Sequence, residues 1–491
     1  MKNKIKLAKT LLLATAFVMA GVVAATAQMP DTSELDKMKS AMQEMQKNMD
    51  QMQQKIDKLE KEKATAAAAP ATQTPSAVEQ ASPSVQLIEK SASGQDIGET
   101  SPVQDRHALN DQQEAAQRPN DLTLDPKYRG FFPIPNTPAL IKFNAKPRVD
   151  MMMDTRNSGN PDRFVTATIP VNNGDPLSGY GGSEQFNINA RGSQLSVDVR
   201  APEIPGNFRF YYNNDFFGSG SGMSYRLKQL YGQFYNITAG FTYSVFEDPD
   251  AWPDTVDFEG PNAVVFARRP VLRYQLPLSD QFQLNLGIEQ PGAEIDAAGI
   301  ANVTGVNSAP DTGFNLRWEN AKVGHVQGAL ILRDIGARSP TTGNQSVFGW
   351  GVNLATSLNA FGRDSFQGQF TYGHGIFRYF NDDFINNDAT FDAAGNLQAL
   401  PAYGVTGGYT HHWSDTLRST ATYGFVNIDN QATQGADAYH QTHYASLNLV
   451  WQLRKRLSVG LEGLYGKKIV QSGDSGDVWR VQLGLVYSLF D

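Results

Sequence analysis

The sequence predicts an all-β transmembrane barrel of about sixteen antiparallel strands, preceded by an N-terminal coiled-coil helix and a flexible linker. Three observations lead to this prediction. The final stretch, 479–491, alternates apolar and polar residues over about ten positions, which is the length that a tilted strand needs to cross a bilayer. The same alternation recurs back to about residue 139. The connections between these segments tend to be alternately long and short, as in barrels of the bacterial outer membrane.

The composition argues against several other classes of protein. The 491 residues carry a net charge of −8, which gives no basis for nucleic acid as a partner. Beyond the N-terminal leader, no apolar run reaches the roughly 20 residues that a transmembrane helix needs. Cysteine is absent, which removes disulfides, thiolate catalysis and cysteine metal sites. We expect neither a metal site nor a cofactor.

Residues 1–27 have the pattern of a secretory signal peptide. An apolar run from Leu11 to Ala25 ends in the small residues of 25–27, which suit cleavage, so we expect the mature chain to begin at Gln28. A transmembrane anchor is disfavoured because the apolar core is short. The basic residues before this run are Lys2, Lys4, Lys6 and Lys9.

Residues 28–63 contain an unbroken heptad pattern and predict a coiled coil. An isolated helix of this length has nowhere to bury an apolar stripe, so it pairs with copies of itself or docks on another surface; the strict 3.5-residue period favours the first. Methionine specifies the number of helices poorly, so the pattern leaves dimer and trimer open. The a positions are Leu35, Met42, Met49 and Ile56, and the d positions are Met38, Met45, Met52 and Leu59.

Residues 64–127 change character and predict a flexible or partly extended linker. An alanine run at 66–69 ends at Pro70, after which Pro, Ser, Gln, Glu and Asp dominate. A linker of this length lets the coiled coil sit in the periplasm well away from the membrane.

Residues 128–491 are the predicted barrel, and both of its ends fall on the side of the short turns, which is the periplasmic side. No repeat of fixed length is present, which argues against a propeller. The predicted strands are Ala139–Met152, Gln185–Val199, Asn207–Phe217, Tyr225–Tyr235, Thr238–Phe246, Phe266–Leu276, Gln281–Glu289, Thr312–Glu319, Gly324–Arg333, Val347–Leu358, Ser365–His374, Ala402–His412, Thr416–Ile428, Thr442–Leu453, Leu457–Gly466 and Val478–Phe490.

Alternation also assigns the two faces of each strand. We expect outward positions to be apolar and inward positions to be polar, which for a ring of this size predicts a water-filled channel. The last strand has aromatic residues near both ends of its apolar face, where such residues would lie at the level of the lipid headgroups. Its sequence also resembles the carboxy-terminal targeting signal of outer-membrane barrels. Expected outward residues include Phe208, Phe210, Phe282, Leu284, Leu286, Ile288, Phe314, Leu316, Trp318, Trp479, Val481, Leu483, Leu485, Tyr487 and Leu489; expected inward residues include Arg209, Gln283, Asn285, Glu289, Asn315, Arg317, Arg480 and Gln482.

One loop stands apart, the third long loop, which joins the fifth and sixth predicted strands. Its segments DPDA and DFEGP, within 248–261, and the following stretch from Ala263 to Tyr274 resemble the DcaP-like family of trimeric outer-membrane porins. The resemblance extends over the leader, the heptad and the strand series, whereas the linker carries no signature. It implies a sixteen-stranded barrel, a homotrimer, a periplasmic coiled coil and the uptake of small, often anionic organic solutes. It also implies contact with outer-membrane lipid and lipopolysaccharide in a Gram-negative bacterium.

In porins of this size the third long loop folds into the barrel and narrows it, so its charges are candidates for the pore constriction. Acids on the loop facing cations on the wall would set up a field that orients dipolar solutes, and arginine in excess can bind carboxylates. Alternatively, individual carboxylates only pin the loop to the wall through ion pairs. The loop acids are Glu247, Asp248, Asp250, Asp254, Asp257 and Glu259, and the wall cations are Arg209, Arg226, Lys228, Arg269, Arg273, Arg317 and Arg333.

The sequence favours a diffusion channel for small hydrophilic solutes over two other functions. An enzyme is disfavoured because the histidines of the strands lie in no nucleophile or metal motif. The stronger alternative is an outer-membrane structural anchor or adhesin, in which the barrel only holds the coiled coil. The histidines in question are His325, His374, His411, His412 and His443.

Overall fold

The computed structural model describes residues 130–174, 179–219, 222–383 and 387–489, all within the unit 95–491. The predicted signal peptide, coiled coil and linker lie outside the described residues. No helix among the described residues is long and apolar enough to cross a membrane. The elements in chain order are β1 (Phe132–Pro133), β2 (Leu140–Lys146), β3 (Arg148–Asp154), η3 (Thr166–Thr168), β4 (Gln185–Asn189), β5 (Gln194–Ala201), β6 (Phe208–Asp215), β7 (Arg226–Phe234), β8 (Ile237–Tyr243), η5 (Pro249–Ala251), β9 (Arg268–Pro277), β10 (Phe282–Glu289), β11 (Ile295–Asp296), β12 (Thr304–Val306), β13 (Asp311–Asn320), β14 (Gly324–Ser339), β15 (Gly343–Asn359), β16 (Ser365–His374), η6 (Phe377–Tyr379), β17 (Ala389–Phe391), β18 (Leu397–Ala399), β19 (Pro401–His412), β20 (Leu417–Ile428), β21 (Tyr439–Arg454), β22 (Leu457–Val470) and β23 (Ser475–Tyr487).

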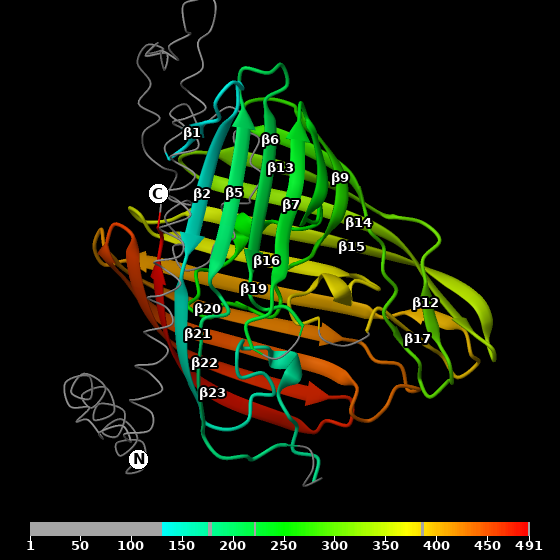
Figure 1. The fold of residues 1–491 in the computed structure, drawn as a ribbon. Helices are drawn as coiled ribbons and strands as arrows, with labels where there is room; N and C mark the ends of the chain where they lie inside the picture. Colours follow the sequence, from blue (N-terminus) through cyan, green and yellow to red (C-terminus); the bar gives the residue numbers. More distant parts are fainter. Residues whose placement is uncertain (1–129, 175–178, 220–221, 384–386, 490–491) are drawn as a thin grey trace, which may run out of the picture. The chain divides into compact units, whose positions relative to one another are not determined.

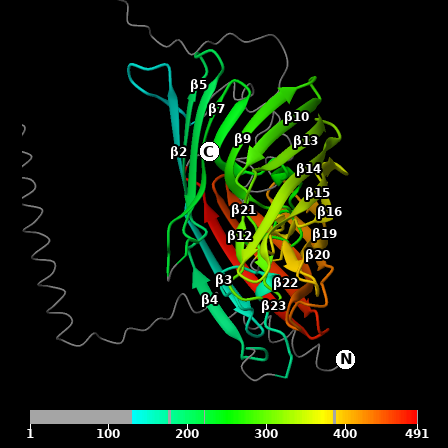
Figure 2. The ribbon, with the colours of Figure 1, turned by 90° about the vertical axis from the view of Figure 1, so that its right-hand side faces the viewer.

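All but three of these strands join one 20-stranded sheet, which closes on itself (Figure 1). β2 and β3 follow one another across Pro147; β2 pairs with β5, whereas β3 pairs with the last strand, β23. Figure 2 shows β23 and β3 side by side. When β2–β3 and β4–β5 are each counted as one strand and the short β1 and β12 are set aside, sixteen strands of the described chain form the ring. That number matches the sequence prediction.

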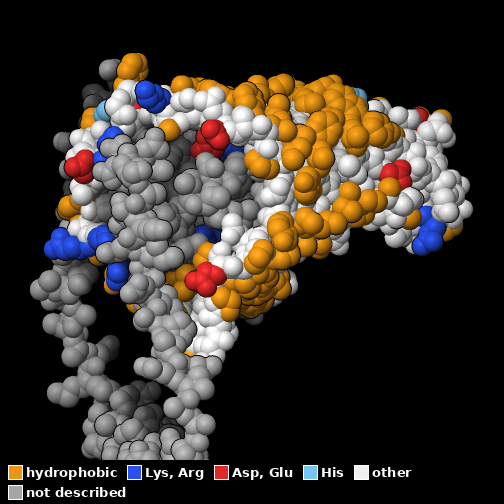
Figure 3. Space-filling model, turned by 90° about the horizontal axis from the view of Figure 1, so that it is seen from above, with side chains coloured by type: hydrophobic (Ala, Val, Ile, Leu, Met, Phe, Trp, Pro, Cys, Tyr) orange, Lys and Arg blue, Asp and Glu red, His pale blue; other side chains and the backbone are white. Residues whose placement is uncertain are grey.

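The side-chain pattern of the strands confirms the predicted faces. In β23, Trp479 is 57% exposed, whereas Arg480 beside it in the sequence is 1% exposed. In β10, Phe282 is exposed and Gln283 is buried, and the same alternation continues along the strand. Hydrophobic side chains accordingly cover much of the outer surface of the sheet in Figure 3. This outer surface is the one that suits a lipid bilayer.

Several strands differ in length from the prediction, for physical reasons. The hairpin of β14 and β15 pairs without interruption to Ser339 and Gly343, well past the predicted end at Arg333. Pairing beyond the hydrocarbon region needs no apolar outward face, so alternation cannot reveal it. The first predicted strand is instead divided at Pro147, which has no N–H to give to a ladder. The last strand ends at Tyr487 rather than at Phe490.

The sequence predicts a water-filled interior, but in the structure loops occupy part of the interior of the ring. Three loops fold inward, which we name L1 (155–184), L3 (244–267) and L6 (375–400). Together with the inner wall they form an apolar cluster in which most side chains are completely buried. Members from the loops are Val165 and Ala167 of L1, Phe246, Ala263, Val265 and Ala267 of L3, and Ile376, Phe377, Tyr379, Phe380 and Leu400 of L6. The loops therefore narrow the lumen as packed bodies.

The outward face of β23 gives a direct test of the membrane-spanning ring. Leu483 lies in the middle of β23, opposite Leu461 and Met151. We expect Leu483→Arg to destabilise the barrel by about 2 to 4 kcal/mol, because it places a charge near the midplane of the bilayer. Unfolding in lipid vesicles by urea measures this effect. Ser472→Arg, at an exposed turn between β22 and β23, is the control and should have little effect. Equal stability of the two variants would contradict the assigned lipid face.

Candidate functional site

L3 is held against the inner wall by hydrogen bonds to its backbone. A loop with little internal secondary structure leaves its C=O groups without partners, and inside a barrel these groups must be satisfied by the protein. Amide side chains on the lumen face of the strands donate most of the hydrogen bonds that these C=O groups accept. The bonds are Asn315 to Val245 (2.6 Å), Gln327 to Glu247 (3.0 Å), Asn353 to Phe246 (3.1 Å), Gln369 to Asp248 (3.3 Å) and Asn448 to Asp254 (2.8 Å). The polar lumen pattern of the strands therefore serves to hold the loop.

The first half of L3 is pinned by Arg317 of β13. Its guanidinium bridges two loop carboxylates, those of Asp248 (3.1 Å) and Asp250 (2.8 Å). His325 of β14 is a second partner of Asp248, at 2.8 Å. Asp248 also accepts the backbone N–H of Asp250 and so caps the short helix η5. All of these groups are buried, so this end of the loop is fixed to β13 and β14.

The second half of L3 has a different partner for each acid. Asp254 accepts from Arg418 of β20 at 2.7 Å, and Glu259 pairs with Arg163 of L1 at 2.9 Å. Among the described residues, no arginine lies within salt-bridge distance of Asp257; its carboxylate accepts the backbone N–H groups of Phe164 (3.3 Å) and Gly260 (3.0 Å). Burial raises the pKa of Asp257 to about 7; Arg480 opposes this rise and Glu259 adds to it.

Four of the predicted wall cations lie under the loops rather than along open space. Arg269, Arg273, Arg317 and Arg333 are all buried. Arg333 pairs with Asp388 of L6 at 2.9 Å and with Asp311 at 3.1 Å. The guanidinium of Arg269 lies 4.4 Å from the ring centroid of Tyr379 in L6, and Arg273 donates to the backbone of Tyr243. Of these four arginines, Arg317 is in direct contact with acids of L3 and Arg333 with an acid of L6.

The other predicted cations lie on the neighbouring part of the wall, in β6 and β7, which β8 separates from β9. Arg209 pairs with Asp198 at 2.9 Å, and Arg226 pairs with Asp215 at 2.6 Å. Lys228 is the extra residue of a β-bulge, because Asn213 lies opposite Gln229 and Asn214 opposite Leu227. The bulge turns Lys228 and Gln229 both inward, which strict alternation cannot do.

A group of cations around two phenylalanines is the main feature of this wall, and we call it the basic cluster. The guanidinium carbons of Arg163, Arg191 and Arg226 each lie 5.3 to 5.4 Å from the ring centroid of Phe217. Phe217 packs on Phe258 of L3, with 4.7 Å between the ring centroids. Cations at this distance from an aromatic ring are attracted to its face. Lys228 lies over the Phe258 ring at 5.3 Å.

The basic cluster carries more positive than negative charge. Three of its acids are Glu259, which pairs with Arg163, Asp162, which pairs with Arg191, and Asp215. Asp215 interacts with three cations, namely Arg226, Lys228 and Arg268. Arg148 also lies over the Phe258 ring, at 5.3 Å, and pairs with Asp150. Six cations therefore face four carboxylates. The side chains of Arg163, Arg191 and Arg226 are 17%, 17% and 24% exposed, so these charges reach solvent, unlike those under L3.

Sequence reasoning missed Arg148, Arg163, Arg191, Arg268 and both phenylalanines of the basic cluster. Arg163 lies in a loop without periodicity and Arg191 at the break between β4 and β5, so alternation gives no signal for either. The only hint for Arg163 is that it directly precedes the apolar stretch 164–169. The predicted Arg226 and Lys228 are the members that alternation did identify.

A small cavity beneath L3 is too small to hold an organic solute. Its volume is about 30 Å³, and its lining includes Asp248, Asp250, Arg273 and Arg317. That volume suits a single water molecule. Within the described ranges, no group of three or more His, Cys, Asp or Glu side chains is arranged to hold a metal ion. The candidate site is therefore the constriction formed by L3 and the basic cluster.

Comparisons with known proteins agree with this architecture. The model of a family described as DcaP outer membrane protein matches residues 99–489. The solved outer membrane channel DcaP of Acinetobacter baumannii is similar, with 20% identity, a TM-score of 0.64, and 72% of this chain and 97% of that chain covered. An anion-selective porin from Comamonas acidovorans has 12% identity and a TM-score of 0.46 over 72% of this chain and 100% of that chain. At these identities a structural likeness speaks for the fold alone. No curated protein sequence matches the chain.

The raised pKa of Asp257 predicts how pH affects the docking of L3. Its ordinary pKa is 3.8, and the folded value is about 7. The folded state therefore binds a proton that the unfolded state releases, so this contribution to stability is lost as pH rises from about 4 through 7. We expect the melting temperature of Asp257→Asn, relative to that of the wild type, to increase between pH 5 and pH 8. Thermal unfolding in detergent measures this difference, and a constant difference would contradict the assignment.

Proposed function

This chain belongs to the DcaP outer membrane protein family, and from that premise we propose that it is a diffusion channel for small hydrophilic solutes that favours small organic anions such as carboxylates. L3 constricts the pore, and the basic cluster supplies the charge that favours anions. No catalytic step is part of this function. The protein acts by the width and the charge of its lumen.

The observation that carries the proposal is that the acids of L3 are buried, whereas the basic cluster carries a net positive charge. The acids of L3 are buried and engaged in direct contacts, as in the pair of Asp254 with Arg418. The basic cluster has six cations for four carboxylates, and the three arginines that reach solvent are each paired with one carboxylate. Each such pair is close to neutral, so the attraction for counter-ions comes from the net positive charge of the cluster as a whole. A solute that passes L3 therefore meets a net positive wall.

Guanidinium groups also suit the proposed class of solute. The fork of an arginine side chain can donate two parallel hydrogen bonds to one carboxylate. Among the residues proposed from the sequence, those assigned to solute contact are Arg209, Arg226 and Lys228. Those assigned to shaping the constriction are Asp248, Asp250, Asp254, Asp257, Glu259, Arg269, Arg273, Arg317 and Arg333.

The assembly is proposed on separate grounds. The heptad spacing of 28–63 and the family resemblance support a homotrimer with a coiled coil in the periplasm, joined to the barrel by the linker 64–127. The exposed apolar belt of the strands supports contact with outer-membrane lipid and lipopolysaccharide. The alternative function, an anchor or adhesin, shares this assembly but needs no conducting lumen. Ion conductance in planar bilayers separates the two functions, because a channel raises the conductance of the bilayer whereas an anchor does not.

Opposite substitutions in one ion pair test the proposed selectivity. Arg226→Gln should lower the ratio of anion to cation permeability, and Asp215→Asn should raise it. A unit charge about 7 Å from an ion in water is worth about 0.6 kcal/mol, so each change should be roughly two- to threefold. The reversal potential under a salt gradient measures the ratio. Arg363→Gln, at a periplasmic turn, is the control. Changes in the same direction for both variants would rule out the basic cluster as the selective element.

Deletion of the heptad tests whether barrel and coiled coil are separate units. We expect a chain without Met29–Lys63 to insert and to conduct as the full chain does, because the described barrel closes through its own strands. Heat-modifiable migration on gels and single-channel recordings report folding and conductance. A deletion variant that forms no folded barrel would show that the two parts depend on one another.

A further inference from the structure

We infer that L1 is a second constriction element of the channel, and that Arg480 of β23 is the residue that positions it. Through this positioning Arg163 of L1 becomes a specificity-determining residue for anions. The inference rests on the proposed channel function. It concerns only the described part of L1, and chiefly the segment 158–169.

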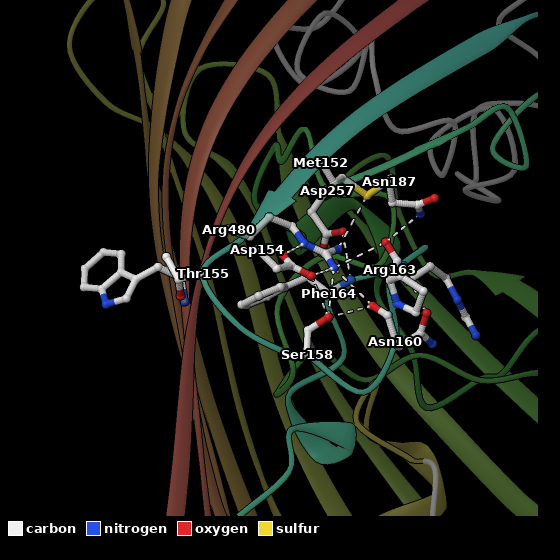
Figure 4. Close-up of polar contacts among 12 residues, drawn as sticks. Met152, Asp154, Thr155, Ser158, Asn160, Arg163, Phe164, Asn187, Asp257 and Arg480 are labelled. Carbon is white, nitrogen blue, oxygen red and sulfur yellow. Dashed lines mark hydrogen bonds and ion pairs between the residues drawn. The ribbon is translucent and has the colours of Figure 1, made fainter. Parts of the chain in front are cut away.

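Arg480 ties the start of L1 to the inner wall. Its side chain is completely buried, and its guanidinium holds both carboxylate oxygens of Asp154, with bonds of 2.6 and 2.8 Å. The same group donates to the hydroxyl of Ser158 (3.2 Å) and to the backbone C=O of Asn160 (3.1 Å). Ser158 in turn donates to Asp154 at 2.7 Å. Figure 4 shows these residues converging on Arg480.

The next residues of L1 pack on the same wall. The ring of Phe164 lies 5.2 Å from the guanidinium carbon of Arg480 and 5.9 Å from the ring of Tyr444. Phe164 and Ile169 form a buried cluster with Tyr444, Leu464 and Val478, which belong to β21, β22 and β23. Burial of this apolar surface stabilises the inward position of the loop.

Two other loops hold L1 from its remaining sides. Asp382 of L6 accepts the hydroxyl of Thr166 (2.9 Å) and the backbone N–H of Ala167 (2.8 Å), next to η3. Asp257 of L3 accepts the backbone N–H of Phe164. L1 therefore lies between L3 and L6 inside the ring, and its contacts are buried rather than superficial.

Arg163 connects this anchored segment to the charge of the pore. It directly precedes Phe164, pairs with Glu259 and lies over Phe217 with Arg191 and Arg226. Arg191 and Arg226 are held near strands of the ring, whereas Arg163 reaches the cluster only while L1 is docked. Asp162 of L1 belongs to the same cluster and pairs with Arg191. Loss of the Arg480 contacts would therefore remove Arg163 and Asp162 together and widen the lumen, while the net charge of the basic cluster stays unchanged.

Arginine is specifically suited to this role. A planar fork satisfies both oxygens of Asp154 and still has donors for Ser158 and Asn160, whereas a lysine ammonium acts as a point charge. Arg480→Lys should therefore restore only part of what Arg480→Gln removes. Because Arg480→Gln leaves Asp154 buried without its cation, the double variant Arg480→Gln with Asp154→Asn is the safer form of the test.

The position of L1 can be measured without reference to transport. The chain has no cysteine, and Val165 of L1 is buried. A Val165→Cys thiol should react slowly with a membrane-impermeant maleimide, and about tenfold or more faster in the Arg480→Gln, Asp154→Asn background, where L1 is released. Ser472→Cys, at an exposed turn, should react at the same rate in both backgrounds.

Single-channel recordings then test the consequence for the pore. The double variant should show larger conductance, with an anion-to-cation permeability ratio close to that of the wild type, because Arg163 and Asp162 leave the basic cluster together. Arg163→Gln removes a single charge and should lower the ratio roughly two- to threefold, with no rise in conductance or in labelling of the Val165→Cys thiol. Arg480→Lys should give intermediate values, and Arg363→Gln should match the wild type.

The outcomes separate this inference from the proposed function. Anion-selective current in the wild type, with unchanged conductance in a double variant whose thiol has become reactive, would overturn L1 as a constriction. An unchanged permeability ratio in Arg163→Gln would overturn Arg163 as a specificity-determining residue. Unchanged thiol reactivity in the double variant would overturn Arg480 as the positioning residue. Absence of any wild-type current would overturn the channel function and the role of L1 in selectivity together, while the labelling experiment would still report the role of Arg480 in placing L1.

Discussion

The rest of the structure depends on the antiparallel pairing of β3 with β23. An unpaired strand edge within hydrocarbon exposes N–H and C=O groups, each of which costs several kcal/mol. Pairing of the first strand with the last removes that edge and fixes the circumference of the ring. It also sets Arg480 opposite Asp154. One ladder therefore closes the sheet and creates the place where L1 begins its inward path.

The lumen face of the sheet is used mainly to hold loops. Amide side chains such as Asn315 and Asn448 donate to the backbone of L3, and Arg317, Arg333 and Arg418 pair with loop acids. A buried charge that loses its partner is strongly destabilising, so these contacts define where each loop must lie. The lumen-facing side chains are polar because they form hydrogen bonds and ion pairs with the inward-folded loops as well as because they contact water.

The sequence was sufficient to predict the strands of the ring and their two faces, but not the positions of the loops inside it. Period-two alternation identified the strands and their faces, including Trp479 outward and Arg480 inward, because one face of each strand meets lipid. Alternation reports which way a side chain points and not what covers it. Alternation thus predicts that Arg317 and Arg333 face the loop acids, but it leaves open whether those acids line the pore or pin the loop; the structure shows Arg317 paired with acids of L3 and Arg333 with an acid of L6. Arg163 lies in a loop without a period, so contacts distant in the sequence decide its position.

The separation between buried ion pairs and the exposed basic cluster has a consequence for the response to ionic strength. Mobile ions have a Debye length of about 8 Å at physiological salt and screen charges that reach water. They hardly reach the contact of Asp254 with Arg418, whose side chains are 0% and 7% exposed. Salt therefore weakens the attraction of Arg163, Arg191 and Arg226 for anions while the contacts that set the aperture persist. In fresh water the same opening discriminates between ions more strongly than in brine.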